Sequence, residues 1–186
     1  MLLNTVEYLA MNNPIRALVH RHYEARKLLR IGGPMSGGCA LEIGCGRGVG
    51  VEIILDRFHA DAVDAFDLDP RMIAKAAKRL KRRDGEVRLW VGNASQIEAK
   101  DAAYDAVFDF GIIHHIPDWA GVLAELWRVL KPGGRLYAEE VLSAYLLHPL
   151  WRRLLDHPLE NRFDFAQFRD GLTHAGFQLV AAAPLG

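Results

Sequence analysis

Leu41-Glu42-Ile43-Gly44-Cys45-Gly46-Arg47-Gly48-Val49-Gly50 is the stretch that decides the fold. It joins a short apolar run at 39–43 to a helical pattern at 48–59 through alternating glycines. Such glycines let the chain turn tightly after a strand and let its backbone approach a ligand without Cβ clashes. Val49 occupies the third glycine position of the dinucleotide fingerprint G-x-G-x-x-G, so that fingerprint is not met. The stretch predicts a ligand-binding turn, with a purely structural strand-to-helix turn as the alternative.

Strand-like and helix-like segments alternate on both sides of this loop. We expect strands at 39–43, 62–68, 86–91, 104–110, 135–141 and 177–182, and helices at 48–59, 70–82, 118–130, 149–155 and 165–175. This alternation implies right-handed βαβ units and a doubly wound, mostly parallel α/β sheet. Ligands of such sheets bind beyond the carboxyl ends of the strands, so the informative residues should directly follow the strands.

The second strand ends in two acidic residues. An acidic side chain about 20 residues after the glycines is placed to accept hydrogen bonds from both hydroxyls of a ribose. We assign that role to Asp67 and the N-cap of the next helix to Asp69, with Asp67 as a second cap being the alternative. Glu42, near the end of the first strand, can accept a hydrogen bond from a cationic amine.

Five short motifs follow one another in a specific order. They are Glu42-x-Gly44-x-Gly46-x-Gly48, then Asp67, then Gly92-Asn93-Ala94, then Tyr104-Asp105-Ala106-Val107, and then Leu130-Lys131-Pro132-Gly133-Gly134-Arg135-Leu136. Each motif is modest, but the ordered set resembles the class I S-adenosylmethionine (SAM)-dependent methyltransferases. It is nearest to the small-molecule group that includes the ubiquinone/menaquinone biosynthesis methyltransferases. The resemblance runs from about residue 40 to residue 180, which is most of the chain.

The resemblance implies SAM as cofactor, S-adenosylhomocysteine as product, and a role for each matching position. The cofactor-binding residues that it implies are Glu42, Gly44, Cys45, Gly46, Gly48, Asp67, Leu68, Asn93, Ala94, Asp109 and Phe110. Loop 44–48 would pass under the methionine and ribose parts, and Asp67 would hold the ribose hydroxyls. Leu68 would flank the adenine, while Asn93 would face its amino group. Many relatives have Asp there, and the neutral amide is a weaker acceptor.

The implied reaction is in-line transfer of a methyl group from SAM to a small-molecule acceptor. The sulfonium already activates the methyl group, so the protein mainly orients the acceptor, which can be worth an effective molarity of about 10⁵–10⁸ M. A general base helps when the acceptor carries a proton. His114 and His115 after the fourth strand, and Glu139 with Glu140 at the end of the fifth, are the candidates for catalysis. A structural hydrogen bond, a helix cap or surface solvation is the alternative for each.

Composition narrows the class of protein. The chain has 186 residues, enough for one domain, in which we expect an N-terminal helical segment at 1–33 and an α/β core at 39–182. Lys and Arg number 23, as do Asp and Glu, which removes any global attraction for DNA. Two cysteines without C-x-x-C spacing predict no metal site and fit a reducing cytoplasm. No apolar run approaches the roughly 20 residues that span a bilayer, and the N-terminus does not resemble a signal peptide.

Three other functions stay open at this point. The chain could hold SAM or its product with little catalysis, because the candidates for a general base have structural alternatives. An NAD-dependent oxidoreductase is disfavoured by Val49 and by the motif at 131–136. An RNA methyltransferase would use the basic helices and would bind RNA with a steep salt dependence.

Two basic clusters and the end of the chain suggest partners. The first cluster contains Arg16, His20, Arg21, His22, Arg26, Lys27 and Arg30, and the second contains Lys75, Lys78, Arg79, Lys81, Arg82 and Arg83. A solvated helix face is the default, and contact of the N-terminal helix with a membrane or an anionic lipid is the sharper hypothesis. Residues 145–153 stand where relatives build substrate lids. Relatives also end with an antiparallel hairpin, of which we expect one strand here, so an exposed sheet edge and a homodimer are predicted.

Overall fold

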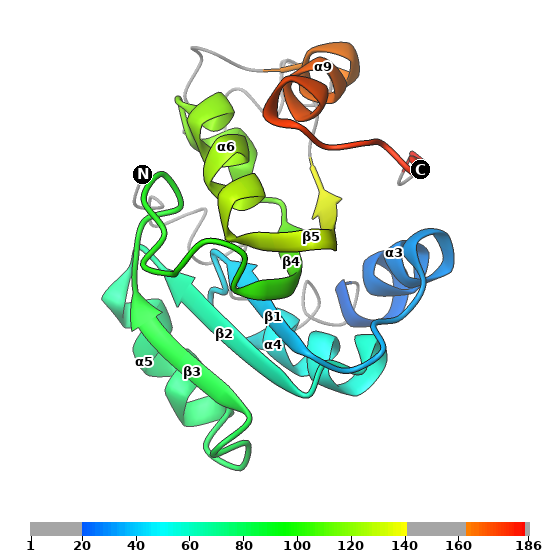
Figure 1. The fold of residues 1–186 in the computed structure, drawn as a ribbon. Coiled ribbons are helices and arrows are strands. Elements are labelled where there is room, and N and C mark those ends of the chain that lie inside the picture. Colours follow the sequence, from blue (N-terminus) through cyan, green and yellow to red (C-terminus); the bar gives the residue numbers. More distant parts are fainter. Residues whose placement is uncertain (1–19, 141–162, 185–186) are drawn as a thin grey trace, which may run out of the picture.

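A single parallel sheet forms the centre of the computed structural model, which describes residues 20–140 and 163–184. The strands follow the order β3-β2-β1-β4-β5, and all four pairings are parallel (Figure 1). The strands are β1 (Cys39–Ile43), β2 (Ala62–Asp67), β3 (Val87–Val91), β4 (Tyr104–Phe110) and β5 (Leu130–Glu139). The order reverses between β1 and β4, which is the switch point where such sheets bind ligands. The predicted doubly wound α/β fold is confirmed.

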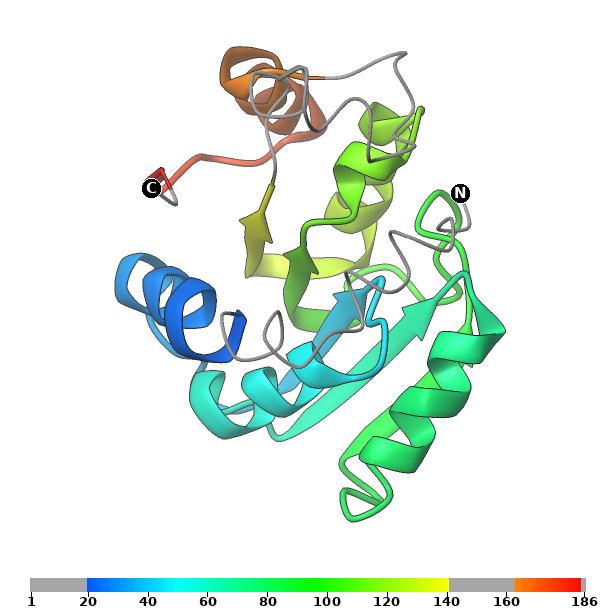
Figure 2. The ribbon, with the colours of Figure 1, turned by 180° about the vertical axis from the view of Figure 1, so that it is seen from behind.

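Helices cover both faces of the sheet (Figures 1 and 2). One face carries the π-helical turn η1 (His20–Glu24), α3 (Ala25–Gly32), α4 (Val49–Ile53), its π-helical continuation η2 (Ile54–Phe58) and α5 (Pro70–Arg79). The other carries the short 3₁₀ turn η3 (Ile113–His115), α6 (Trp119–Val129) and α9 (Phe165–Ala175). The sheet is therefore buried on both sides, as expected for parallel strands.

The sequence pattern explains these elements. In β1, Ala40 packs into the core under α4, whereas Leu41 and Ile43 pack into the core under α6, because successive side chains of a strand point to opposite faces. Asp69 caps α5 through a hydrogen bond from the Arg71 amide (2.8 Å), as predicted. Helix α9 occupies the predicted residues, and Gly176 ends it in the left-handed conformation with φ 109°.

The predicted final strand at 177–182 is wrong. Residues 177–184 have no regular secondary structure. Phe177 packs edge-on against Trp127 of α6, with ring centroids 5.1 Å apart, and Lys27 of α3 donates a hydrogen bond to the Pro184 carbonyl. Val180 is 90% exposed. A run of apolar residues forms a strand only when it meets a sheet edge, and these contacts lead the segment from α6 toward α3.

The start of the fifth strand also differs from the prediction. Strand β5 begins at Leu130, directly after α6, rather than at Arg135. Leu130 pairs with Tyr104 and Arg135 pairs with Ala106, so residues 131–134 bulge out of register. The predicted loop is therefore an irregular part of the strand.

Several predictions fall outside the described residues. These are the helix at 149–155, the lid at 145–153, and the N-terminal helical segment before residue 20, with its membrane contact. Within residues 20–140 and 163–184, no helix combines the length and the apolar character needed to cross a membrane.

Candidate active site

The glycine loop makes close contacts beneath the carboxyl end of β1. Gly44 has φ 64°, and a Cβ at this position would lie 2.6 Å from Cγ2 of Ile112. Cys45 is 5% exposed and belongs to the core, so its thiol faces away from solvent, while its amide donates to the Phe66 carbonyl (2.9 Å). The pKa of this thiol is raised, mainly by burial. In this loop the backbone, rather than the Cys45 side chain, is what remains to contact a ligand.

Glu42 is a buried carboxylate under the first turn of α4. It is 2% exposed, and a side chain at Gly50 would overlap its Oε1 atom. Its Oε2 atom has no hydrogen-bond partner among the described residues. Burial, followed by the charges of Asp67 and Asp109, raises the pKa of Glu42 well above its usual range. A buried acceptor of this kind is costly unless a donor or a cation meets it.

Asp67 joins the loops that follow β1 and β2. Its Oδ2 accepts a hydrogen bond from the Gly46 amide (2.9 Å), and its Oδ1 accepts one from the Asp69 amide (2.8 Å). A carboxylate has about four acceptor sites, so both oxygens can still accept hydroxyl donors. Burial raises the pKa of Asp67, and the two backbone hydrogen bonds oppose that rise. The structure thus joins Asp67 to the glycine loop, and its contact with a ribose stays a prediction.

The predicted adenine-binding residues follow neighbouring strands. Asp67 pairs with Val91 in the register of β2 and β3, so Leu68 and Asn93 lie on adjacent loops. Leu68 is 44% exposed, which leaves an apolar surface open to a flat ring. Asn93 Oδ1 accepts a hydrogen bond from the Ser95 amide (3.0 Å), and Ala94 is buried. The Asn93 side-chain oxygen therefore uses part of its hydrogen-bonding capacity to stabilise the turn in which Asn93 lies.

A buried polar cluster follows β4 and β5. His114 Nδ1 lies 2.6 Å from Glu140 Oε2, and these side chains are 8% and 4% exposed. Glu140 Oε1 also accepts from the Ile113 amide (2.7 Å), and Asp109 Oδ1 accepts from the Ile112 amide (2.9 Å). Burial, then the nearby charge of Glu140, raises the pKa of Asp109 well above its usual range. Its Oδ2 has no hydrogen-bond partner among the described residues.

The remaining predicted catalytic residues border this cluster. The rings of His114 and His115 lie 4.1 Å apart between centroids. Glu139 is 8% exposed and stands opposite Phe110 in the register of β4 and β5. The pairing of His114 with Glu140 is not visible in the sequence, since the two residues are 26 positions apart. The signal that could have found it is that both directly follow neighbouring parallel strands.

These residues create one acidic edge, a name that we use for the carboxylates at the carboxyl ends of β1, β2, β4 and β5. Its members are Glu42, Asp67, Asp109, Glu139 and Glu140. Like charges in a low-dielectric environment raise each other's pKa and attract a cationic ligand. Among the described residues, no group of three or more His, Cys, Asp or Glu side chains has an arrangement that could hold a metal ion.

A doubly wound parallel sheet with a glycine loop and carboxylates at its switch point defines an α/β protein of the kind that binds ligands beyond the carboxyl ends of its strands. The family model described as a methyltransferase domain matches residues 41–138. The chain belongs to this family, and its fold and motifs are those of the class I SAM-dependent methyltransferases.

Individual relatives agree with this assignment. A demethylmenaquinone methyltransferase from Lactiplantibacillus plantarum is 31% identical over 151 residues, or 78% of this chain. The chain spans 63% of the length of that curated relative. A putative methyltransferase solved in complex with the Trm112 activator of Haloferax volcanii has a TM-score of 0.75 at 20% sequence identity. The match covers 95% of this chain and 77% of the chain in that structure. Phosphoethanolamine N-methyltransferase 2 of Haemonchus contortus, solved with S-adenosyl-L-methionine, has a TM-score of 0.69 at 22% sequence identity. The match covers 95% of this chain and 45% of the chain in that structure. At such identities the two structures show the fold alone.

Proposed function

We propose that this protein binds SAM and transfers its methyl group to a small-molecule acceptor. The observation that carries the proposal is the acidic edge, above all the buried Oε2 of Glu42, which has no described hydrogen-bond partner. SAM carries an ammonium and a sulfonium, and such a cation would compensate a buried carboxylate. The residues present therefore fit this cofactor, and a small-molecule acceptor agrees with the relative named above.

Each part of the site has a distinct task in this proposal. Glu42 and the backbone near Asp109 hold the amino-acid end of the cofactor. Asp67 accepts the ribose hydroxyls while its bonds to the Gly46 and Asp69 amides keep the two loops together. The exposed face of Leu68 packs against the adenine, beside Asn93. When bound, SAM supplies an activated methyl group, and the chain's own contribution is to orient the acceptor toward it.

His114 is the group that we assign to proton transfer. The Glu140 carboxylate accepts a hydrogen bond from Nδ1 of the His114 ring. The other ring nitrogen of His114 therefore points away from that carboxylate. The Ile113 and His114 amides hold the Glu140 carboxylate at 2.7 and 3.4 Å, so the ring orientation is supported by the backbone. His115 and Glu139 border the same cluster and are the alternative groups for contact with the acceptor.

The first experiment is calorimetric titration of the protein with SAM, S-adenosylhomocysteine and NADH. We expect micromolar binding of the first two and none of NADH. Asp67→Ala should weaken SAM binding by about 100-fold, because hydrogen bonds to a charged acceptor contribute about 1.5–3 kcal/mol each. Binding of NADH alone would overturn the proposal. Unchanged SAM affinity in Asp67→Ala would remove this residue from the site.

We also propose that two copies associate through the outer edge of β5. Among the described residues, β5 pairs with β4 alone, and 177–184 adds no strand beside it. An open edge offers unpaired backbone groups to a second chain. Sedimentation velocity across a range of protein concentrations tests this: a concentration-dependent dimer is expected, and a monomer at all concentrations contradicts it.

A further inference from the structure

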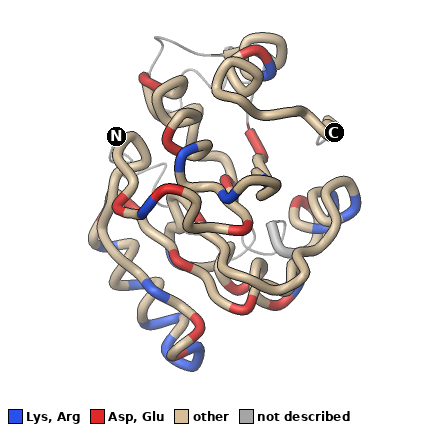
Figure 3. The backbone as a smooth tube through the Cα atoms, viewed as in Figure 1, with Lys and Arg blue, Asp and Glu red and all other residues tan. Residues whose placement is uncertain are grey.

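An ion pair on α6 reaches the segment that follows β3. Figure 3 shows an acidic and a basic segment in the second half of α6, which are Glu125 and Arg128. Arg128 donates from Nε to Glu125 Oε1 (2.7 Å) and from Nη2 to Glu125 Oε2 (2.8 Å). It also donates to the carbonyls of Ile97 (3.0 Å) and Ala99 (2.8 Å) and to Asp101 Oδ1 (2.8 Å). A guanidinium has five N–H donors in a fixed fork, so these bonds use all of them. We call Glu125 and Arg128 the α6 clamp.

The α6 clamp binds both backbone polar groups of Ile97. The Ile97 carbonyl accepts from Arg128, and the Ile97 amide donates to Glu125 Oε2 (2.8 Å). The hydrogen bonds from Arg128 lower the pKa of Glu125, which keeps this acceptor ionised. Hydrogen bonds to ionised partners are about twice as strong as neutral ones. The Ile97 side chain is 4% exposed and belongs to the core under α6, so position 97 is fixed by its backbone and its side chain.

A short turn at 93–96 precedes the clamped residue. Its ends, Asn93 and Gln96, form an isolated antiparallel bridge, and the Gln96 amide donates to the Asn93 carbonyl (3.0 Å). The Ser95 amide donates to Asn93 Oδ1 (3.0 Å). Ala94 is 5% exposed and packs into the same core as Ile97. The turn therefore has a defined internal shape.

The two ends of this turn are attached to different parts of the fold. Before the turn, the Gly92 amide donates to the carbonyl of Asp67 at the end of β2 (3.1 Å). After the turn, Ile97 is bound by the α6 clamp. The place of the turn relative to Asp67 is thus set by β2 at one end and by α6 at the other.

We propose that the α6 clamp positions the turn at 93–96 against the adenine of the cofactor. This inference rests on the proposed function, in which Asn93 lies beside the adenine. Glu125 and Arg128 are then positioning residues, which act on the cofactor through Ile97. A turn that is held in place before binding loses less conformational freedom when the cofactor binds. Cofactor affinity and discrimination between bases should therefore depend on the clamp.

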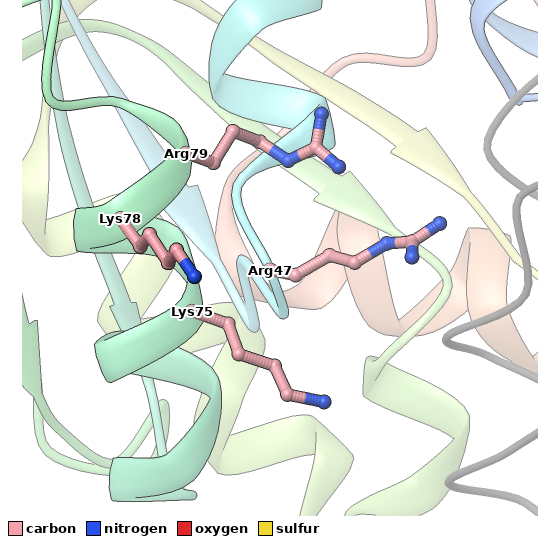
Figure 4. A pocket seen from close by; sticks show the side chains of 4 residues that line it. All are labelled: Arg47, Lys75, Lys78 and Arg79. Atoms are coloured by element: carbon pink, nitrogen blue, oxygen red, sulfur yellow. The ribbon is translucent and has the colours of Figure 1, made fainter.

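The chain contains a closely matched control for the clamp. The Glu125 and Arg128 side chains are 22% and 31% exposed. Glu52 of α4 pairs with Arg79 of α5, which Figure 4 shows, and these side chains are 22% and 33% exposed. This second pair lies on the opposite face of the sheet. Glu125→Gln and Glu52→Gln thus make the same change in two similar ion pairs. Arg128→Lys is a second clamp variant that keeps the charge and removes the fork.

Hydrogen exchange measured by mass spectrometry reports how firmly the turn is held. The amides of Ser95, Gln96 and Ile97 donate to acceptors in the turn and the clamp, so peptides that cover 92–101 contain the informative sites. We expect exchange in this segment to be about tenfold faster in Glu125→Gln and to change less than about twofold in Glu52→Gln. Peptides from β1 and β4 show in the same experiment that each variant is folded.

Calorimetry then compares S-adenosylhomocysteine with S-inosylhomocysteine, in which an oxygen replaces the adenine amino group. We expect the wild-type protein to prefer the adenosyl compound at least about tenfold. Glu125→Gln and Arg128→Lys should weaken binding of that compound about tenfold and reduce the preference to less than about threefold. Glu52→Gln should change both quantities less than about twofold.

The outcomes separate this inference from the proposed function. Faster exchange at 92–101 together with a reduced base preference supports the inference. Unchanged exchange in both clamp variants overturns it, as does a base preference that both variants retain or that the wild-type protein lacks. Equal effects of Glu125→Gln and Glu52→Gln overturn it as well, because they show only a general loss of stability. A wild-type protein that binds neither compound contradicts the proposed function itself, and the inference with it.

Discussion

The acidic edge and the exposed basic face of α5 differ in burial as well as in charge. Glu42 is 2% exposed and its Oε2 has no described hydrogen-bond partner, whereas Arg79 is 33% exposed and pairs with Glu52. The interaction energy between charges is larger in the low-dielectric interior and is reduced where solvent screens them. The comparison teaches that the acidic edge should control cofactor affinity and stability, while the partly exposed ion pairs of α5 should contribute little to either.

The largest expected effect comes from the helix turn above the acidic edge. An Ala at position 50 would overlap Glu42 Oε1 and would lie 2.8 Å from Cδ2 of Phe110. We expect Gly50→Ala to lower the free energy of unfolding by about 3 kcal/mol, because overpacking displaces buried groups. Urea denaturation measures the loss. Gly46→Ala is the control, since no atom lies within 4 Å of the added Cβ, and a smaller loss of about 1 kcal/mol is expected from its positive φ alone.

The next effect separates chemistry from binding within the acidic edge. Glu140→Gln keeps the shape of the side chain but removes the charge 2.6 Å from His114 Nδ1. If Glu140 positions His114, turnover should fall about 10- to 100-fold, as for other groups that orient a histidine, while the Kd for SAM stays within about twofold. Steady-state kinetics together with calorimetry measure both quantities. A parallel loss of SAM binding would show that Glu140 belongs to the cofactor site instead.

A smaller effect appears in the pH dependence of stability. The pKa of Glu42 in the folded protein is raised above its ordinary value of 4.5, chiefly by burial. The contribution of such a group is fully present below the ordinary pKa and is lost as the pH rises through the folded pKa. Glu42→Gln should therefore become more stable relative to wild type as the pH rises above about 4.5, by about 1–3 kcal/mol at most.

Chemical unfolding of both proteins between pH 4 and pH 8, without ligand, measures this difference. A stability difference that does not change with pH would show that Glu42 is not the titrating group. Saturating SAM should reduce or reverse the difference, because the cation compensates the ionised carboxylate.

The smallest effect is expected at the ion pair between Glu52 and Arg79. Glu52→Gln removes the partner of Arg79 and should change stability by less than about 1 kcal/mol, since this ion pair is partly exposed. Urea denaturation of the variant and the wild-type protein measures this difference in stability. A loss above about 2 kcal/mol would contradict the expectation that solvent screens this pair.

Much of the fold could be predicted because its determinants are local. The strand-like segments at 39–43 and 104–110 predicted strands, and both strands occupy those residues in the structure. Asp69 and Gly176 marked the ends of helices because a side-chain cap and a left-handed glycine are short-range features. The segment at 177–182 misled the same reasoning, since its apolar pattern contains no information on the contacts with Trp127 and Lys27 that determine its path.

The sequence by itself determined the class of fold, the glycine loop and the identity of most site residues. The reason is that residues directly following the strands of a parallel sheet lie at its ligand-binding edge. Only the tertiary structure decided which of these residues meet. It paired Glu140 with His114, buried Glu42 beneath Gly50, and gathered Arg47 with three cations of α5. These contacts join residues that are distant in the chain, and their energies depend on burial, which a linear pattern does not contain.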